Sequence, residues 1–222
     1  IAACVPFNSL AADSSITLES GYVSKYVVNG LSRTGGSAYV NVNAVKSAKI
    51  VDVFVDGTLL PNGSLDESHW QLGLSKGIPL FKNTSLKFNT GVIRHQSGGS
   101  VVPNSTEFAV KLALDNTFLI PYVRGSTDLD LHQTGYVVGL AKPLYVLGFD
   151  LVLAGEWGRF DDYEVIQAKA GVYRKFTVFN SEFTPFVEAS YIDNRFDVTN
   201  YNFAVKELNG NMVVMGGVRV KF

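Results

Sequence analysis

The sequence predicts an all-β fold, a closed antiparallel transmembrane β-barrel of about 12 strands. Three observations lead to this prediction. Apolar and polar side chains alternate along segments of roughly ten residues, short and long connections alternate between the segments, and aromatic residues gather near the segment ends. The composition fits, because 46% of the 222 residues are hydrophobic, which excludes a disordered chain. The formal net charge of -1 gives no signal for nucleic acid as a partner.

The closing and opening segments show the alternation most clearly. In MVVMGGVRVKF, at 212–222, every second residue from Met212 is apolar or glycine, and the other face carries Arg219 and Lys221. In ITLESGYVSKYVV, at 16–28, one face is mostly apolar and the other carries Glu19 and Lys25. Ten further segments follow the pattern less cleanly, near 37–47, 49–57, 68–79, 84–96, 105–115, 118–126, 135–143, 149–160, 163–176 and 182–193.

The connections fall into two alternating classes. Short connections lie at 47–48, 81–83, 116–117, 144–148 and 177–181, and longer or more polar ones at 29–36, 57–67, 96–104, 126–134 and 194–201, with 161–162 in the second class by position. An even number of strands then puts both chain ends on the short-turn side. This layout is typical of outer-membrane barrels with short periplasmic turns and longer extracellular loops. Merging a weak segment such as 49–57 with its neighbour would give ten strands.

A sheet can cross lipid only if it closes on itself, with apolar side chains outside and polar ones around the lumen. We therefore expect the residues on the polar parity to line a pore, and they are Glu19, Lys25, Asp52, Lys87, Glu107, Lys111, Arg124, Glu156, Lys169, Glu188 and Arg219. Lys76 and Lys142 fall on the outward parity near the turn side, where a lysine stem can reach the headgroups.

Aromatic residues on the outward parity are expected at the two headgroup levels. Those near loop-side strand ends are Tyr26, Trp70, Phe108, Tyr136, Trp157 and Tyr191, and those near turn-side ends are Phe222, Phe88 and Phe149. The alternative is a soluble secreted β-domain with a solvated polar face, in which aromatics would lie in mid-strand as often as at the ends.

The N-terminal residues 1–12 are interpreted as a residual signal peptide or N-terminal arm, followed by the barrel at 13–222. Ser9-Leu10-Ala11 has the small-x-small form of a cleavage site, so we expect cleavage after Ala11 or Ala12. The alternative is a lipoprotein signal in which Cys4, the single cysteine, is lipidated. Either interpretation describes an exported chain.

Phe222 ends an alternating strand, and this resembles the C-terminal assembly signal of bacterial outer-membrane proteins. The resemblance implies the outer-membrane assembly machinery as a partner. The segments at 21–43, at 184–191 and GGVRVKF at 216–222 resemble the TorF-type family of bacterial outer-membrane porins. The chain departs from that family at Asn29, where an arginine is expected, and at 47–49, which replaces a glycine-rich turn. The resemblance implies a porin-like protein of Gram-negative bacteria with no established substrate.

The sequence predicts no enzyme, no cofactor and no metal site, since its histidines lack ligand spacing. Two weaker alternatives remain. His95 and Ser97, with Asn89 nearby, resemble the pair of a lipid-acting barrel hydrolase, although His95 falls on the lumen parity. The loop acids Asp128, Asp130, Asp161 and Asp162 could bind a divalent cation, but solvated acids are the simpler interpretation.

These observations predict a bacterial outer-membrane channel for passive diffusion of small polar solutes, with the lipid bilayer as its surroundings. About 12 strands are intermediate between a filled barrel and a wide channel, so we expect a narrow pore. The predicted lining nearly balances acids and bases, so we expect weak ion selectivity. The alternative is a non-conducting structural or adhesion barrel acting through outer loops at 57–67 and 96–104.

Overall fold

The structure is a computed structural model that describes residues 14–28, 31–34, 36–48, 50–61, 67–97, 104–116, 118–161, 163–196 and 211–222. Within the strands, the side chains of 26, 28, 31–34, 196 and 211 are not described. The N-terminal segment 1–12, with Cys4 and the expected cleavage site, lies outside the described residues. Over the described ranges, we find no helix with the length and apolar character needed to cross a membrane.

Fifteen strands make up the described chain. They are β1 (Ser14–Val23), β2 (Tyr26–Val28), β3 (Leu31–Thr34), β4 (Ser37–Lys46), β5 (Asp52–Leu60), β6 (Glu67–Phe81), β7 (Thr84–Ser97), β8 (Ser105–Asn116), β9 (Ile120–Asp128), β10 (Gln133–Val146), β11 (Phe149–Phe160), β12 (Tyr163–Tyr173), β13 (Phe176–Val178), β14 (Ser181–Phe196) and β15 (Asn211–Lys221).

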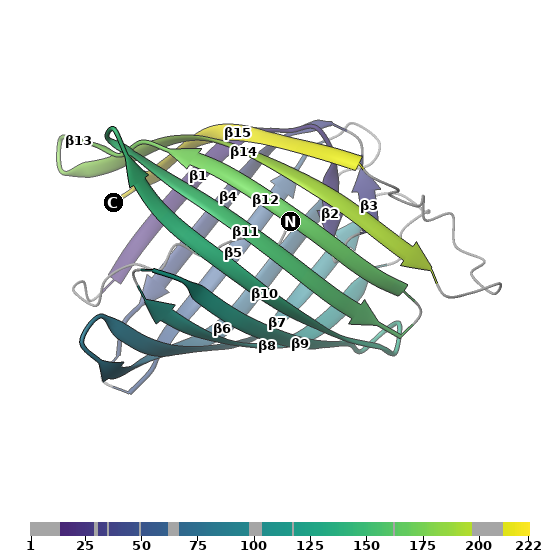
Figure 1. Ribbon diagram of the computed structural model, residues 1–222. Coiled ribbons are helices and arrows are strands. Elements are labelled where there is room, and N and C mark those ends of the chain that lie inside the picture. Colours follow the sequence, from purple (N-terminus) through teal and green to yellow (C-terminus); the bar gives the residue numbers. More distant parts are fainter. Residues whose placement is uncertain are drawn as a thin grey trace.

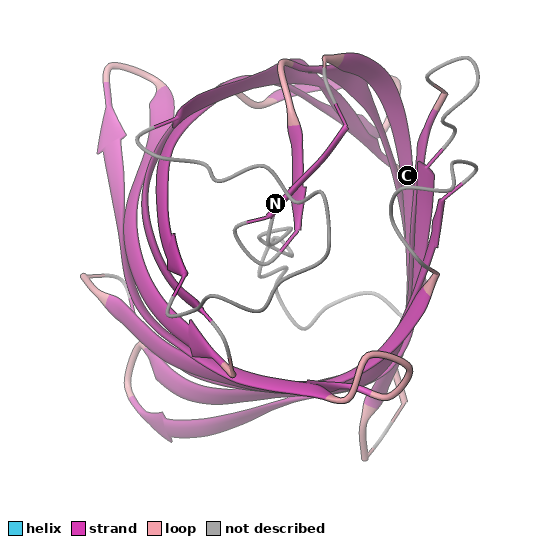
Figure 2. Cartoon of the chain, turned by 90° about the vertical axis from the view of Figure 1, so that its right-hand side faces the viewer, coloured by secondary structure: helices cyan, strands magenta, loops and turns pink. Residues whose placement is uncertain are grey.

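The long strands form a closed antiparallel barrel (Figures 1 and 2). Each pairs with its neighbour along the chain from β4 to β12, β1 pairs with both β4 and β15, and the pairing of β12 with β14 closes the ring. The barrel thus has 12 strands, and β13 is one extra strand that pairs only with β14. Figure 1 shows the β13–β14 hairpin projecting beyond one end of the barrel. Complete closure leaves no unpaired edge in the wall.

The two ends of the barrel differ, as the alternating connections predict. We call the end where β10 reaches Val146 the turn-side end, and the end where β1 reaches Val23 the loop-side end. Two of the turns have two central residues with positive φ: Leu147 and Gly148 at 50° and 83°, and Phe179 and Asn180 at 49° and 66°. This geometry matches the twist of the flanking strands, so these turns connect neighbours tightly.

The first predicted strand is wrong in length. Alternation continues to Val28, but β1 ends at Val23 and the chain then leaves the wall to form the separate β2–β3 hairpin. Ser24 marks the exit, because its N–H donates to the carbonyl of Val214 at 2.8 Å and its Oγ accepts from the N–H of Val214 at 2.9 Å. The third predicted strand is also displaced, since β5 begins at Asp52 rather than at residue 49.

The two faces of the wall have opposite character. Along each strand the exposed parity is mostly apolar, as for Leu153, which is 49% exposed, and Val218, which is 41% exposed. The parity that faces the enclosed interior includes buried charged residues such as Glu107 and Glu188, each 4% exposed. A water-soluble barrel would show the reverse arrangement, because its apolar residues would fill the interior.

Candidate pore and its charged lining

Ten of the eleven predicted lining residues lie on the interior parity of barrel strands. The exception is Lys25, which lies between β1 and β2, outside the wall, and is half-buried. Of the remaining ten, Glu19 lies on β1, Asp52 on β5, Lys87 on β7, Glu107 and Lys111 on β8, Arg124 on β9, Glu156 on β11, Lys169 on β12, Glu188 on β14 and Arg219 on β15.

One interior cluster bridges β15, β1 and β4, where the first and last strands of the barrel pair with each other. The Nε and Nη2 atoms of Arg219 on β15 donate to Oε2 of Glu19 on β1, at 2.7 and 2.6 Å. The hydroxyl of Tyr39 on β4 donates to the other oxygen of Glu19 at 2.8 Å. The Arg219 guanidinium also lies 5.4 Å from the ring centroid of Phe186. The Arg219 guanidinium balances the charge of the Glu19 carboxylate and the Tyr39 hydroxyl adds a hydrogen bond, so this part of the lining is fixed and paired.

Two further ion pairs continue the charged lining around the wall. Lys169 on β12 forms an ion pair with Glu188 on β14, which also accepts a hydrogen bond from the hydroxyl of Tyr173. On the opposite side, Lys87 on β7 forms an ion pair with Asp115 on β8. These pairs place a base beside an acid at each point, which limits the field inside the lumen.

Tyr122 connects a further acid and base of the lining, Glu156 and Lys111. Tyr122 on β9 donates its hydroxyl hydrogen to Glu156 on β11, across β10. The Nζ of Lys111 lies 4.1 Å from the centroid of the same ring. The strand between them allows this span because a Cβ at Gly139 would lie only 2.3 Å from Cζ of Tyr122. Gly139 therefore provides the space in which the ring crosses β10.

The loop-side end of the lumen has a polar wall of acids and histidines on β5 to β8. Nε2 of His95 lies 3.3 Å from Oε2 of Glu107, and Nε2 of His69 lies 3.6 Å from Oδ1 of Asp56. The two histidine rings are neighbours, with centroids 6.1 Å apart. Asp56 also accepts hydrogen bonds from the amides of Asn41 at 3.1 Å and Asn43 at 3.2 Å on β4.

The opposite arc of the loop-side lumen is apolar. Its side chains come from eight strands of the wall, namely β1, β4, β5, β10, β11, β12, β14 and β15. They form one buried cluster with Val27 of the β2–β3 hairpin. We call this cluster the apolar arc, and its barrel members are Val23, Tyr39, Leu60, Val137, Phe160, Tyr163, Val165, Phe186, Ile192 and Val213. Figure 2, which looks along the barrel, shows a short strand pair inside the ring of wall strands. This arc departs from the polar lining expected from the sequence, because Val27 of the hairpin packs against apolar side chains there.

Sequence reasoning missed several interior acids. Asp56, Glu67, Asp115, Asp128, Asp150 and Glu182 share the interior parity of their strands. The signal was present for Asp56 and Asp115, which lie at even spacing from Asp52 and Lys111 in the same strands. With these residues included, acids outnumber bases on the interior parity of the described strands, and the near balance expected from sequence does not hold.

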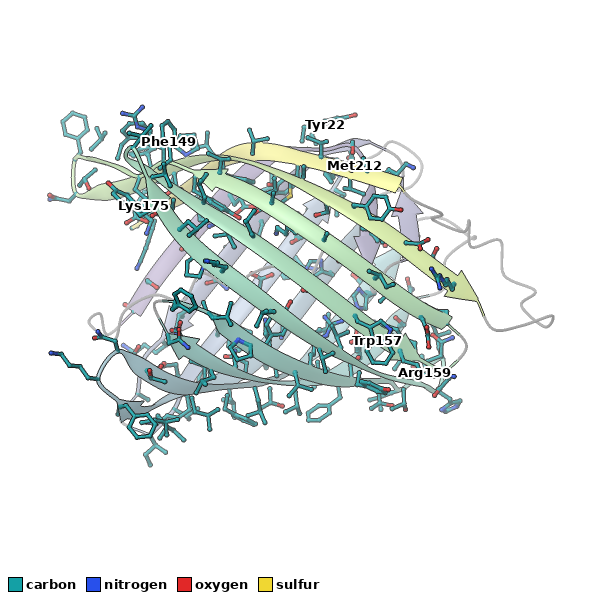
Figure 3. The ribbon with its side chains drawn as sticks, viewed as in Figure 1. Tyr22, Phe149, Trp157, Arg159, Lys175 and Met212 are labelled. Atoms are coloured by element: carbon teal, nitrogen blue, oxygen red, sulfur yellow. The ribbon has the colours of Figure 1, made fainter. Side chains whose placement is uncertain are left out.

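The aromatic residues predicted to lie at the lipid headgroups are on barrel strands or follow one directly, with the exception of Tyr26. Trp70, Phe108, Tyr136 and Tyr191 are exposed on the outward parity near the loop-side end. Trp157 packs edge-on against Tyr136 with centroids 5.6 Å apart, and Figure 3 shows it at the same end as Arg159. Phe149 and Lys175 lie at the other end of the barrel in that view, and Phe222 follows β15 there. Tyr26 belongs to β2 and not to the wall, and its side chain is not described.

The alternative catalytic and metal-binding residues do not assemble into a site. His95 is buried on the interior parity, in contact with Glu107, whereas a hydrolase of the expected kind needs it on the lipid-facing wall. Asp128 accepts the backbone N–H groups of Asp130 and Leu131, and Asp161 accepts that of Thr134, while Asp162 lies outside the described residues. In the described part of the chain, no three His, Cys, Asp or Glu side chains come together as metal ligands.

Comparison with known proteins gives a fold but no family. A scan against protein families finds no match, and a search of curated proteins finds none. The TorF-type resemblance therefore stays a prediction. Among solved structures, the chain is similar to the KdgM porin in complex with disordered oligogalacturonate, at 10% identity and a TM-score of 0.57, covering 94% of this chain and 99% of that one.

Two more structures have comparable similarity. The NanC porin shares 11% identity at a TM-score of 0.53, covering 92% of this chain and 98% of that one. The Salmonella typhi outer membrane phospholipase OMPLA, a dimer with bound calcium, shares 10% identity at a TM-score of 0.51, covering 92% and 89%. The fold is thus a closed 12-strand antiparallel barrel of the porin type with one extra strand.

Proposed function

We propose that this chain is a porin-like channel of a bacterial outer membrane that allows passive diffusion of small polar solutes. The observation that carries the proposal is the closed ring with an apolar exterior and a charged, hydrogen-bonded interior. Lipid accepts such a wall because every backbone group in it is paired within the sheet. The charged interior, in turn, favours water and polar solutes over lipid.

The similar structures support this proposal at the level of fold. Two of them are porins, and the KdgM structure was determined in complex with oligogalacturonate, a chain of acidic sugars. The interior of the present barrel has more acids than bases, which does not suit an anionic solute. We therefore propose neutral or cationic small polar molecules as the solutes.

The pore is proposed to be narrow, with its constriction at the loop-side end. A barrel of this size has an intermediate interior width. The β2–β3 hairpin takes part of that width, because Val27 is 1% exposed within the apolar arc. Solutes would then pass along the polar wall of β5 to β8, where His69, His95 and Glu107 lie.

The pore is also proposed to be weakly selective, with a modest preference for cations. Away from the loop-side end, Arg219, Lys169 and Lys87 each lie beside an acid, so the net field is small. At the loop-side end Asp56 lies beside His69, and Glu107 lies beside His95 with Arg124 nearby. The acids of this end, which include Glu67, give cations the lower barrier.

Single-channel recording in planar bilayers tests the proposal. We expect small, discrete conductance steps and a reversal potential in a salt gradient that favours cations slightly. Changing Glu107→Gln should reduce the cation preference, whereas the matched control Glu164→Gln, on the outward parity of β12, should leave it unchanged. Absence of conductance would support the structural or adhesion alternative, and a strong anion preference would contradict the proposed lining.

We do not propose catalysis for this barrel, although one similar structure is a phospholipase. The contact between His95 and Glu107 inside the lumen favours a role in the polar wall. Lipid hydrolysis by the purified protein should therefore equal that of a His95→Ala variant. Hydrolysis that depends on His95 would replace the channel proposal with an enzymatic one.

A further inference from the structure

The outer surface has different charges at its two ends. Among the described residues, three arginines on the loop-side half of the outward parity have acidic neighbours. Arg94 lies 3.0 Å from Asp130, Arg159 lies 2.9 Å from Glu164, and Arg195 lies 3.8 Å from Asp193. On the turn-side half, the described acids Asp52, Asp115, Asp150 and Glu182 all fall on the interior parity, while the outward charges are the basic Lys46, Lys76, Lys142 and Arg174.

Two of the four turn-side bases, Arg174 and Lys142, lie on aromatic rings. The guanidinium of Arg174 is 5.1 Å from the centroids of both Phe149 and Phe176. The Nζ of Lys142 is 4.9 Å from the centroid of Phe118. Such contacts hold a cation against an apolar surface, at the depth where hydrocarbon gives way to headgroups.

The tips of the neighbouring turns carry large apolar side chains in an unfavourable backbone conformation. Leu147 is 91% exposed with φ of 50°, and Phe179 is 97% exposed with φ of 49°. Asparagine, aspartate or glycine is preferred at such positions, since a left-handed conformation costs other residues free energy. Burial of these side chains in the hydrocarbon of a lipid leaflet would offset that cost. Both tips continue the apolar outer face of the wall through Val146 and Val178.

We propose that these residues form a lipid-binding collar, in which Lys142 and Arg174 bind the phosphates of anionic lipids while Leu147 and Phe179 insert into the same leaflet. The inference rests on the proposed membrane location and adds to it a preference for lipid charge. The described acids of this end, including Asp150 and Glu182, lie on the interior parity and not on the outward face that carries Lys142 and Arg174. A basic residue close to an anionic lipid surface favours binding by roughly fivefold.

The test compares urea unfolding of the full chain in vesicles of phosphatidylcholine and in vesicles of phosphatidylcholine mixed with phosphatidylglycerol. We expect the anionic lipid to shift the unfolding equilibrium constant of the wild type toward the folded barrel by about fivefold or more. The double variant Lys142→Gln, Arg174→Gln should lose most of that shift. The matched control Arg94→Gln, Arg159→Gln removes the same charge from the loop-side end and should keep it. Inorganic phosphate added to phosphatidylcholine vesicles should not reproduce the effect.

The proposal is overturned if anionic lipid has no effect on the wild type, or if both double variants lose the shift equally. A second pair of substitutions tests the turn tips. Leu147→Asn with Phe179→Asn should stabilise the barrel in detergent but destabilise it in vesicles of either lipid, because apolar insertion does not depend on headgroup charge. Stabilisation in detergent and in vesicles alike would show that the tips do not insert into the leaflet. Insertion into phosphatidylcholine and channel conductance should be normal in every variant, so a failure of the collar is distinguishable from a failure of the channel.

Discussion

The carboxylate of Glu19 connects three strands at the pairing of β1 with β15. Glu19 accepts from Arg219 and Tyr39, which come from the two neighbouring strands. The change Glu19→Gln should destabilise the vesicle-embedded barrel by about 1–3 kcal/mol, because it removes a charge-assisted bond in a half-buried site. Urea unfolding measures this change. The control Glu164→Gln breaks the exposed ion pair with Arg159 and should cost less than ~1 kcal/mol, so equal losses would argue against a special role for Glu19.

Two glycines let the same strands approach closely. Gly21 and Gly217 face each other across β1 and β15, and a Cβ at Gly217 would lie 2.2 Å from the carbonyl oxygen of Ser20. The change Gly217→Ala should therefore destabilise the barrel by about 1–3 kcal/mol or prevent closure. Heat-dependent mobility in detergent gels separates folded from unfolded barrel. Gly155→Ala is the control, because a Cβ at Gly155 meets nothing within 4 Å, and an equal effect there would contradict the steric argument.

Among the elements, the β2–β3 hairpin has the clearest consequence for transport. Val27 ties it to the apolar arc, and the hairpin is joined to the wall at β1 and β4. The change Val27→Asp places a charge among buried apolar side chains, which should release the hairpin and raise the single-channel conductance. Val27→Leu keeps an apolar side chain and should leave conductance near the wild-type value. Unchanged conductance in Val27→Asp would mean that the hairpin does not limit the pore.

The element scale also shows what the sequence could not predict. Alternation continues through 24–28, so the local pattern is the same whether this segment pairs in the wall or turns inward, and only the distant contact of Ser24 with Val214 decides. The ion pairs depend on register in the same way. The Cα partner of Lys87 is Ala113, and its acid Asp115 lies two residues further along β8. Strand parity could be predicted from the sequence, but diagonal pairing across the tilted wall could not.

For the whole molecule, the sequence predicted the closed barrel and its strand number because closure and alternation are global constraints. A strand with one apolar face repeats the same physical requirement in every segment, so errors of a few residues at strand ends do not accumulate. The proposed pore depends on a few interior residues that depart from the general pattern, such as Val27 and Glu67, and these lie near strand ends, where parity is hardest to assign. The role of Phe222 in assembly stays a prediction of the same kind.

The central claim is that apolar side chains contact lipid and that the other parity surrounds water. Nitroxide labels at single cysteines along β11, in a Cys4→Ser background and in vesicles, test it most directly. Collision with oxygen, which concentrates in lipid, should dominate at Leu151, Leu153 and Gly155, and collision with a water-soluble nickel complex at Val152 and Ala154. Oxygen access at Val152 and Ala154 with nickel access at Leu151 and Leu153, or no alternation at all, would contradict the claim.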